Sequence, residues 1–536
     1  MRTNPFTHNM VRFQSGRFDE PDRQFVRIIN TLYICENFKD NRELIPEIYS
    51  TPECFVNLNC NDFGKQASPD YERVHNVTFT PFGENVVDFC YRMKNLLNFD
   101  ENVNENIHKW FEYVFGTKQE LEEGKANGFT NFQTYCYAQE INFEQMRSNL
   151  EKEKNSEKEI FKQLKNTVNL VINLGQTPYQ LLDDTFANMK RKITNEKNNN
   201  VITGKQISFS KNDIIIDFTK SVDGDSIYFI TKTKNILIYN NTTLNIDAPF
   251  LPRSNFRFFS KIKGSTFPIY KPKFLFCELS KRKFIFCRYL DNTIKYFIHS
   301  KTNSTLPTKI VVDSFVTCVI RINANEFLTG HQNGKVTHWF IDTGELVEIK
   351  ILKSLYANEN SIMAMMYSEK LNLVATADSC NVTLRNEFSF EYLCNIHIER
   401  KYKKINIVDV KISNCDLVYV LYNIGDTEQH VLCGYTLNGI YFGEVQGAIA
   451  NFEFTKQGKI LCSYYHDCKI DVIDPVNFSV VYSKENFGFS CGLIDENTLM
   501  FSFDEEKMWI DVVYAKEEKW NFIREEISKE EWNYFK

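Results

Sequence analysis

Three carboxylates, Asp19, Glu20 and Asp22, surround Pro21 near the start of the chain, and such a cluster could do acid–base chemistry. Apolar residues then recur at helical spacing: Phe25, Ile28, Ile29, Leu32 and Tyr33. Proline suits the first position of a helix, and acidic groups there face its unpaired N–H groups and positive dipole end. We therefore interpret these carboxylates as the first turn of a helix rather than as a catalytic pair.

A second candidate for chemistry is His108, which lies two residues before Trp110. Both belong to an apolar helical stretch, which favours packing over function. The chain contains no HExxH word and no P-loop, and the glycine-containing stretch "FGFSCG" that begins at Phe487 does not match a phosphate cradle. The alternative is a hydrolase or transferase that uses Asp19, Asp22 or His108 as acid–base groups. The sequence favours a protein that is not an enzyme, and it predicts no cofactor and no metal site.

Composition narrows the class of protein further. The chain has 536 residues, 43% of them hydrophobic, and a formal net charge of −6 from 63 basic and 69 acidic residues. Such a balance argues against nucleic acid as a partner. The 15 cysteines are scattered and form no CxxC pair, which is typical of reduced thiols in the cytoplasm. The sequence shows no signal peptide and no apolar run of membrane-spanning length, so we expect any membrane contact to be peripheral.

The elements that must position these residues differ between the two parts of the chain. Up to about residue 184, the apolar spacing predicts helices over 86–97 and 106–115. The stretch 150–166 begins as a charge run, interpreted as a solvated helix face, and becomes amphipathic through Phe161, Leu164, Val168 and Val171. Residues 189–200 are polar and asparagine-rich, which indicates a linker.

Beyond about residue 202, short Ile-, Val-, Phe- and Tyr-rich runs alternate with tight turns, which predicts strands. Similar units begin near seven positions: Ile214, Phe274, Phe315, Ser361, Ile407, Ile449 and Phe489. Most steps are roughly 40–46 residues, the period of a four-stranded propeller blade. About seven such units would close a ring and remove free sheet edges.

The clearest unit, "NEFLTGHQNGKVTHWFIDTGEL", resembles a WD repeat, with Gly334 in its turn and Trp339 at the tryptophan position. Phe340 replaces the aspartate of the repeat. In later units Arg385 and Ile473 occupy the tryptophan position, while Asp474 keeps the aspartate.

Four words in the first part occur in order: "FDEPDR", "LIPE", a stretch from "HKW" to "FGTKQ", and "GQTP". Together they resemble the BEACH (Beige and Chediak-Higashi) domain family, in which a WD-repeat propeller commonly follows the domain. The residues that carry the resemblance are Phe18, Asp19, Pro21, Asp22, Arg23, Leu44, Ile45, Pro46, Glu47, His108, Trp110, Phe115, Gly116, Lys118, Gln119, Gly175, Gln176, Thr177 and Pro178. In the family these words belong to the folded body of the domain rather than to an active centre.

The resemblance implies a mainly α-helical BEACH-like domain, incomplete in this chain, followed by an all-β propeller, and the count of units predicts seven blades. We expect a C-terminal part of a BEACH domain over 1–184, a linker over 185–203, a propeller over 204–520 and a tail over 521–536. The front of the BEACH domain and the PH-like domain of the family are expected to be missing. The implied function is a noncatalytic scaffold for protein–protein interaction in vesicle traffic, lysosome-related organelles, autophagy, or membrane fusion and fission.

One further segment, Pro249–Lys273, combines aromatic residues with six bases and no acids. The bases are Arg253, Arg257, Lys261, Lys263, Lys271 and Lys273. Basic and aromatic residues together attract an anionic membrane surface. The alternative is a long loop between blades whose aromatic residues pack down and whose bases face water, and this second interpretation is the favoured one.

Overall fold

The structure is a computed structural model, and it describes residues 20–21, 27–29, 49–67, 73–79, 82–114, 134–137, 141–174, 176, 205–208, 215–222, 226–231, 236–240, 245–250, 275–288, 292–298, 308–343, 347–398, 405–425, 427, 429–455, 457–465, 467, 469–485, 490–493, 499–503 and 507–512. The chain divides into two compact units, Met1–Lys197 with Lys519–Lys536 and Asn198–Glu518. Among the described residues, no helix is long and apolar enough to cross a bilayer.

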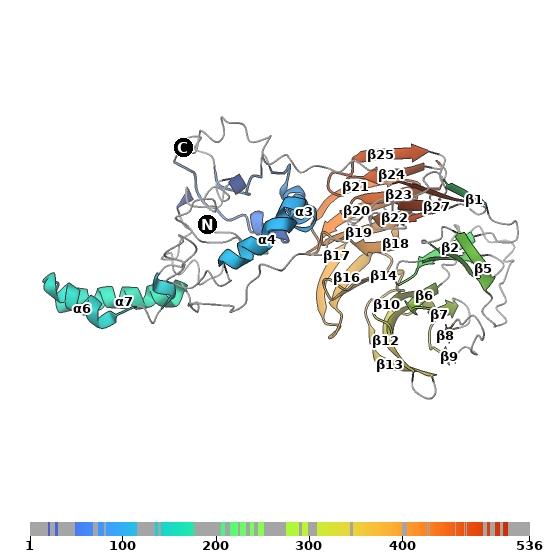
Figure 1. Cartoon of the computed structure of the whole chain (residues 1–536), viewed down its shortest axis with the longest axis horizontal. Helices are drawn as coiled ribbons and strands as arrows, with labels where there is room; N and C mark the ends of the chain where they lie inside the picture. The colour runs from blue at the N-terminus through green and yellow to red at the C-terminus, as the bar shows by residue number, and fades with distance from the viewer. Residues whose placement is uncertain are drawn as a thin grey trace. The chain divides into compact units, whose positions relative to one another are not determined.

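The N-terminal unit contains several helices among its described residues (Figure 1). They are the 3-10 helices η3 (Pro52–Phe55) and η5 (Thr134–Cys136) and the α-helices α3 (Val86–Phe99), α4 (Glu101–Val114), α6 (Phe143–Lys152) and α7 (Glu157–Leu174). The Asn85 side chain accepts bonds from the Val87 and Asp88 amides at the start of α3, as expected of an N-cap. The helices predicted over 86–97 and 106–115 are thus confirmed as α3 and α4.

Aromatic packing builds a core for this unit around α3. Phe55 and Phe79 lie edge to face with ring centroids 5.1 Å apart, and Phe79 lies 4.8 Å from Phe89. Ile28 and Phe89 are fully buried in the same cluster. The cluster thus joins the segment around Ile28 to α3. Aromatic pairs of this kind stabilise a fold by more than the area that they bury.

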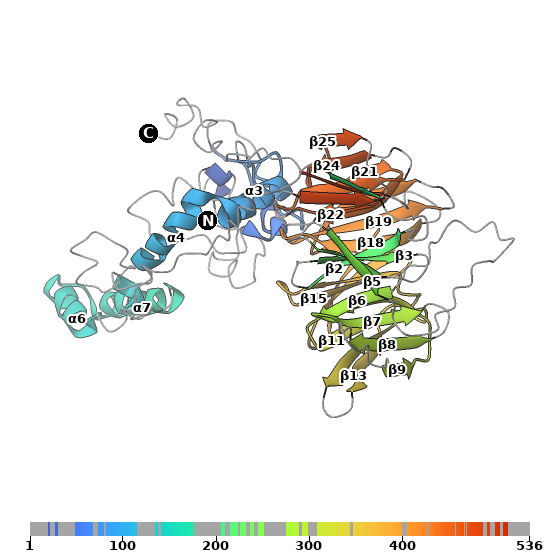
Figure 2. The ribbon, with the colours of Figure 1, turned by 45° about the vertical axis from the view of Figure 1, so that its right-hand side comes forward.

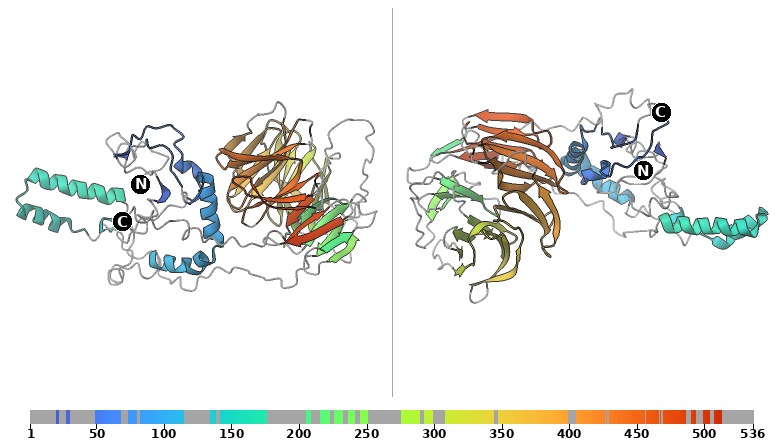
Figure 3. Two further views of the ribbon diagram at one scale, coloured as in Figure 1. Left: turned by 90° about the horizontal axis from the view of Figure 1, so that it is seen from above. Right: turned by 180° about the vertical axis from the view of Figure 1, so that it is seen from behind.

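The charged residues at 150–159 are exposed, as the sequence predicts, but they are divided between two helices, because α6 ends at Lys152 and α7 begins at Glu157. Ser156 and Glu159 form a reciprocal capping arrangement at the break. The Glu159 carboxylate accepts bonds from the Ser156 amide and hydroxyl, and the Glu159 amide donates to Ser156 Oγ. This is the capping box that starts a helix, and it turns the chain back so that α6 and α7 pack side by side (Figure 3).

The described residues of Asn198–Glu518 form seven four-stranded antiparallel sheets (Figures 1 and 2). Six of them are blades built from four consecutive strands. Their strands are β2 (Ile215–Lys220), β3 (Ser226–Thr231), β4 (Ile236–Asn240), β5 (Asn245–Phe250), β6 (Leu275–Ser280), β7 (Lys283–Arg288), β8 (Thr293–Ile298), β9 (Thr308–Val311), β10 (Val316–Arg321), β11 (Glu326–His331), β12 (Lys335–Thr343), β13 (Val347–Tyr356), β14 (Ala364–Ser368), β15 (Leu373–Ala377), β16 (Asn381–Asn386), β17 (Tyr392–His397), β18 (Ile405–Ile412), β19 (Leu417–Ile424), β20 (His430–Thr436), β21 (Tyr441–Gly447), β22 (Ile449–Phe454), β23 (Ile460–Tyr464), β24 (Lys469–Ile473) and β25 (Val480–Glu485).

The seventh sheet is assembled from both ends of this unit. It contains β26 (Ser490–Leu493), β27 (Leu499–Phe503) and β28 (Lys507–Val512), and β1 (Lys205–Ser208) completes it by pairing with β28. A strand from the start of the propeller therefore covers the edge that its last strand would leave free. The predicted propeller is confirmed, and each expected unit start lies at or beside the first strand of a sheet.

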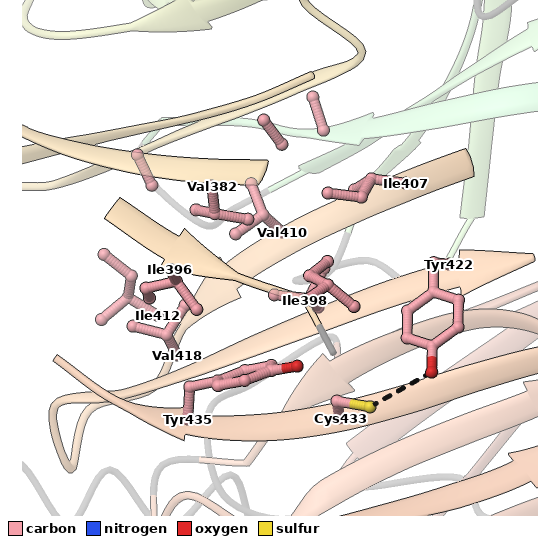
Figure 4. Close-up of a cluster of buried hydrophobic side chains, with 14 of the residues drawn as sticks. Val382, Ile396, Ile398, Ile407, Val410, Ile412, Val418, Tyr422, Cys433 and Tyr435 are labelled. Atoms are coloured by element: carbon pink, nitrogen blue, oxygen red, sulfur yellow. Dashed lines mark hydrogen bonds between the residues drawn. The ribbon is translucent and has the colours of Figure 1, made fainter. Parts of the chain in front are cut away.

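The propeller core lies between neighbouring sheets. Figure 4 shows the cluster between β14–β17 and β18–β21, where Ile396, Ile407 and Val418 are fully buried. Cys433 Sγ donates to Tyr422 Oη at 3.8 Å, and burial raises the pKa of the Tyr422 hydroxyl. Cys433 therefore packs as a small apolar group with a weak S–H bond, as the sequence predicted for its cysteines.

Candidate functional site

Trp339, the clearest motif residue of the propeller, ends a chain of buried hydrogen bonds. Its Nε1–H donates to Thr329 Oγ1 at 2.7 Å, and Thr329 Oγ1 lies 2.9 Å from His331 Nε2. His331 Nδ1 lies 3.2 Å from the Ser314 carbonyl oxygen, which can only accept. The proton is thus on Nδ1, and Nε2 accepts from the Thr329 hydroxyl. Burial lowers the pKa of His331, which keeps the ring neutral and the chain of bonds intact.

Gly334 lies in the turn between β11 and β12 at φ +78°, a conformation that glycine adopts without strain. A Cβ there would come within 2.1 Å of the Asn358 carbonyl oxygen. The Gly334 carbonyl accepts a bond from the Ala357 amide. This turn therefore holds the segment that leads into the next blade.

Arg385 occupies the tryptophan position of the following blade with different chemistry. Its guanidinium donates to the carbonyl oxygens of Phe390 at 3.2 Å and Ala357 at 2.9 Å. Ala357 precedes the first strand of the same blade, so Arg385 joins the loop at Phe390 to the loop at Ala357 by hydrogen bonds. At the same position of the previous blade, the Trp339 side chain is buried in the core. Burial lowers the pKa of this guanidinium.

A backbone irregularity marks the tryptophan position in four blades. The pairing of the third and fourth strands shifts immediately before Trp339, Arg385, Tyr435 and Ile473. The positions assigned from sequence to Arg385 and Ile473 coincide with this bulge. Sequence reasoning missed Tyr435, which is 1% exposed. The turn before the third strand is longer in this blade, from Ile424 to His430, than in the Trp339 blade, from His331 to Lys335, so no WD-like spacing marks Tyr435.

Asp474, the retained aspartate, caps a turn. One carboxylate oxygen accepts from the amides of Val476 and Asn477 at 3.0 and 3.1 Å, and the other lies 3.4 Å from Lys459 Nζ. This is an Asx-type turn that directs the chain into β25.

Side chains on the innermost strands join one blade to the next. The Arg321 guanidinium on β10 donates to the Leu279 carbonyl at 2.7 Å, and Asn451 on β22 donates to the Cys491 carbonyl at 3.0 Å. The innermost strands of neighbouring blades do not pair through backbone hydrogen bonds. Side chains therefore supply the donors for the carbonyls of Leu279 and Cys491.

Another of these joints centres on Lys411. Its Nζ donates to the Phe452 carbonyl at 2.5 Å, lies 3.2 Å from Glu453 Oε1 and 3.9 Å from Asp409 Oδ2. Burial by itself lowers the pKa of this ammonium, but the carboxylates of Glu453 and Asp409 outweigh it and raise the pKa above its usual value. Lys411 therefore stays charged.

Three motif residues of the N-terminal unit lie among described residues. Pro21 packs beside Gly64, where a Cβ would come within 2.8 Å of the proline ring. His108 is half-buried, and its Nδ1 has no hydrogen-bond partner among the described residues. The Gln176 side chain donates to the carbonyls of Tyr135 and Val171, at 3.0 and 3.3 Å, which ties the end of α7 to η5.

The other motif positions lie outside the described residues, so their assigned roles stay predictions. These are Phe18, Asp19, Asp22, Arg23, Leu44, Ile45, Pro46, Glu47, Phe115, Gly116, Lys118, Gln119, Gly175, Thr177 and Pro178, with the side chain of Trp110. The six bases of Pro249–Lys273 also lie outside them, and so does the linker over 189–200.

Comparison with known proteins concerns the first part of the chain. The Beige/BEACH domain family model matches residues 1–189. A stretch of 137 residues is 34% identical to BEACH domain-containing protein lvsD of Dictyostelium discoideum, covering 25% of this chain and 5% of that protein. A stretch of 188 residues is 31% identical to Beige protein homolog 1 of Schizosaccharomyces pombe, covering 34% of this chain and 6% of that protein.

The chain thus spans only a small share of the curated relatives that it matches. The matched region contains all four words that resemble the family, and a β-propeller follows it in the same chain. Residues 1–189 are thus similar to the Beige/BEACH domain family, whose model they match.

Proposed function

We propose that the chain is a noncatalytic scaffold that holds proteins together during membrane and vesicle traffic. The processes that the family resemblance points to are lysosome-related organelles, autophagy, and membrane fusion or fission. The observation that carries the proposal is the joining of a Beige/BEACH segment over residues 1–189 to a β-propeller. Propellers present broad rims of loops on a rigid body, which suits recognition by surfaces. The expected place of action is the cytoplasm, with peripheral contact to endomembranes.

Exposed apolar pairs on two adjacent blades support this proposal. At the bulge of β13, Ile351 and Leu352 are 56% and 53% exposed. At the same bulge of β17, Tyr392 and Leu393 are 59% and 52% exposed. Apolar side chains left in water on a protein surface favour contact with other proteins.

Rescue of a cell that lacks the chain tests whether catalysis is needed. A variant with Asp19→Asn, Asp22→Asn and His108→Gln removes every acid–base candidate. A scaffold predicts that this variant restores lysosome size and autophagic flux as well as the wild type, provided that thermal unfolding shows it to be folded. A folded variant that fails to rescue would favour the hydrolase or transferase.

Capture of partners tests the propeller surface. We expect a variant with all four exposed apolar residues changed to serine to lose partners that the wild-type chain captures from cells. The matched control is Glu348→Gln with Glu391→Gln, which changes exposed residues in the same region but keeps the apolar pairs. Equal capture by the two variants would exclude this rim as the contact surface.

A further inference from the structure

An apolar stripe runs along the outer face of α7. Phe161, Val168 and Ile172 are 70%, 42% and 69% exposed. They are seven and eleven residues apart, two and three helical turns, so they lie on one face. We call these three residues the α7 stripe. The sequence predicts that Phe161 and Val168 belong to an amphipathic helix, but α7 packs against α6 through other residues.

The contact with α6 uses the neighbouring face of α7. Ile160 is 5% exposed, Leu150 of α6 is 8% exposed, and Thr167 Oγ1 lies 3.7 Å from Met146 Sδ of α6. The α7 stripe therefore lies next to the contact between α6 and α7 and takes no part in it. A hairpin of two helices with one open apolar face can bury that face by accepting a third helix.

Lysines border the α7 stripe on the side away from α6. Lys158, Lys162 and Lys165 are all exposed and recur at helical spacing. None of them has an ion pair within 4 Å in the part of the chain that the structure describes. They lie close enough to the stripe to meet side chains of whatever covers it.

The acids in the first turn of α7 have partners within the hairpin. Glu159 serves the capping box with Ser156 and also interacts electrostatically with Lys162. Glu157 lies 4.0 Å from Arg147 of α6, on the other side of the stripe. The charge beside the α7 stripe, on the side away from α6, is thus mainly positive.

We propose that the α7 stripe is a docking surface for an amphipathic helix of a partner protein, one whose apolar face is bordered by aspartate or glutamate. Its apolar side chains would cover Phe161, Val168 and Ile172, and its acids would pair with the three lysines. This proposal rests on the scaffold function and names the class of partner that the N-terminal unit takes.

A membrane surface fits the same stripe less well. Helices that lie in the membrane interface carry bases on the polar face that flanks their apolar side. Here α6 lies along the other side of the α7 stripe. Three exposed acids, Glu144, Glu151 and Glu153, lie on α6 or directly after it. Charge complementarity therefore favours an acidic helix over an anionic bilayer.

Binding of two labelled synthetic peptides to the full chain tests the proposal by fluorescence anisotropy. The peptides share one amphipathic leucine pattern and differ only in having glutamate or lysine beside it. We expect the glutamate peptide to bind roughly tenfold more tightly, with an affinity that falls as salt rises. Phe161→Ser with Ile172→Ser should abolish binding.

Charge exchange distinguishes specific docking from damage to the fold. A variant with Lys158→Glu, Lys162→Glu and Lys165→Glu should lose the glutamate peptide and gain the lysine peptide. The matched control, Lys283→Glu, Lys309→Glu and Lys335→Glu, makes the same change in net charge on the propeller and should keep wild-type preference.

Equal binding of both peptides, absence of binding, or binding to vesicles with anionic lipid in place of the peptides would overturn the proposal. Because the assay uses purified chain and no cell, a failed rescue of trafficking with intact peptide binding would count against the scaffold function alone. Loss of the peptides with intact rescue would count against the α7 stripe alone.

Discussion

At the scale of single residues, the propeller depends on a neutral imidazole. His331 lies between a hydroxyl that donates to it and a carbonyl that accepts from it. With a second proton on the ring, His331 Nε2 would become a donor to Thr329 Oγ1, which already accepts from Trp339 Nε1. The hydroxyl proton of Thr329 would then lose the acceptor that Nε2 provides. Protonation of the ring therefore costs the folded blade stability.

A pH dependence of stability follows. Burial lowers the pKa of His331 in the folded state, so the unfolded chain takes up a proton first as pH falls. Its contribution to stability is full above the unfolded pKa of about 6.5 and is lost as pH falls from there through the folded pKa. We expect a slope of up to about 1.4 kcal/mol per pH unit in this window, measured by urea unfolding. His331→Gln should reduce that slope, and an unchanged slope would contradict the assignment.

Gly334 and Gly439 separate backbone strain from steric clash. Both have positive φ, +78° and +88°, but a Cβ at Gly439 would meet nothing closer than 3.7 Å. We expect Gly439→Ala to cost about 1 kcal/mol of unfolding free energy from strain alone. Gly334→Ala should cost about 1–3 kcal/mol more, because its Cβ would press on the Asn358 carbonyl. Equal losses in chemical denaturation would show that the loop at Asn358 moves away freely.

At the scale of elements, the joints between blades rely on side chains because inner strands share no ladder. Lys411 is the clearest case, since β18 contributes the ammonium while β22 contributes both a carbonyl and a carboxylate. A charged group in such a place stabilises the fold only while its oppositely charged partners are present. The joint therefore couples two blades that are not paired by backbone.

A double-mutant cycle measures that coupling. Lys411→Met alone should destabilise the chain by about 2 kcal/mol or more, because Glu453 and Asp409 are left without their cation. Adding Glu453→Leu should recover part of the loss, as removal of both partners costs less than removal of one. Strictly additive losses in urea unfolding would mean that the pair does not interact across the joint.

At the scale of the whole molecule, closure of the propeller depends on a strand of four residues. β1 pairs with β28 from Lys205↔Ile510 to Ser208↔Lys507. Without it, β28 would be an exposed edge open to pairing with other chains. The beginning and the end of the unit thus support each other.

Proline substitutions in β1 test this closure. Adjacent residues of a strand point their N–H groups to opposite sides, so Gln206→Pro with Ile207→Pro removes one ladder donor whichever side faces β28. We expect the unfolding temperature to fall by roughly 5 °C and aggregation to increase. The control, Gln206→Thr with Ile207→Val, should behave as the wild type. Unchanged melting of the proline variant would show that β1 contributes little to closure.

The sequence by itself determined the propeller and the similarity of the first part to the Beige/BEACH domain family. Each unit carries its own strand alternation and turn residues, and these local signals do not depend on distant contacts, so the positions near Ile214 and Ile449 could be placed closely. Trp339 and Gly334 were found for the same reason, because one short word contains the strand, the turn and the next strand.

Only the tertiary structure decided which residues meet across blades and which faces stay open. The bonds of Lys411 to β22, the use of Arg385 between two loops, and the pairing of β1 with β28 join residues far apart in the chain, and no local pattern encodes them. The same holds for α7, where helical spacing predicted an amphipathic helix but could not show that Phe161 faces water. Spacing fixes which side chains share a face, whereas burial depends on what the rest of the fold brings against that face.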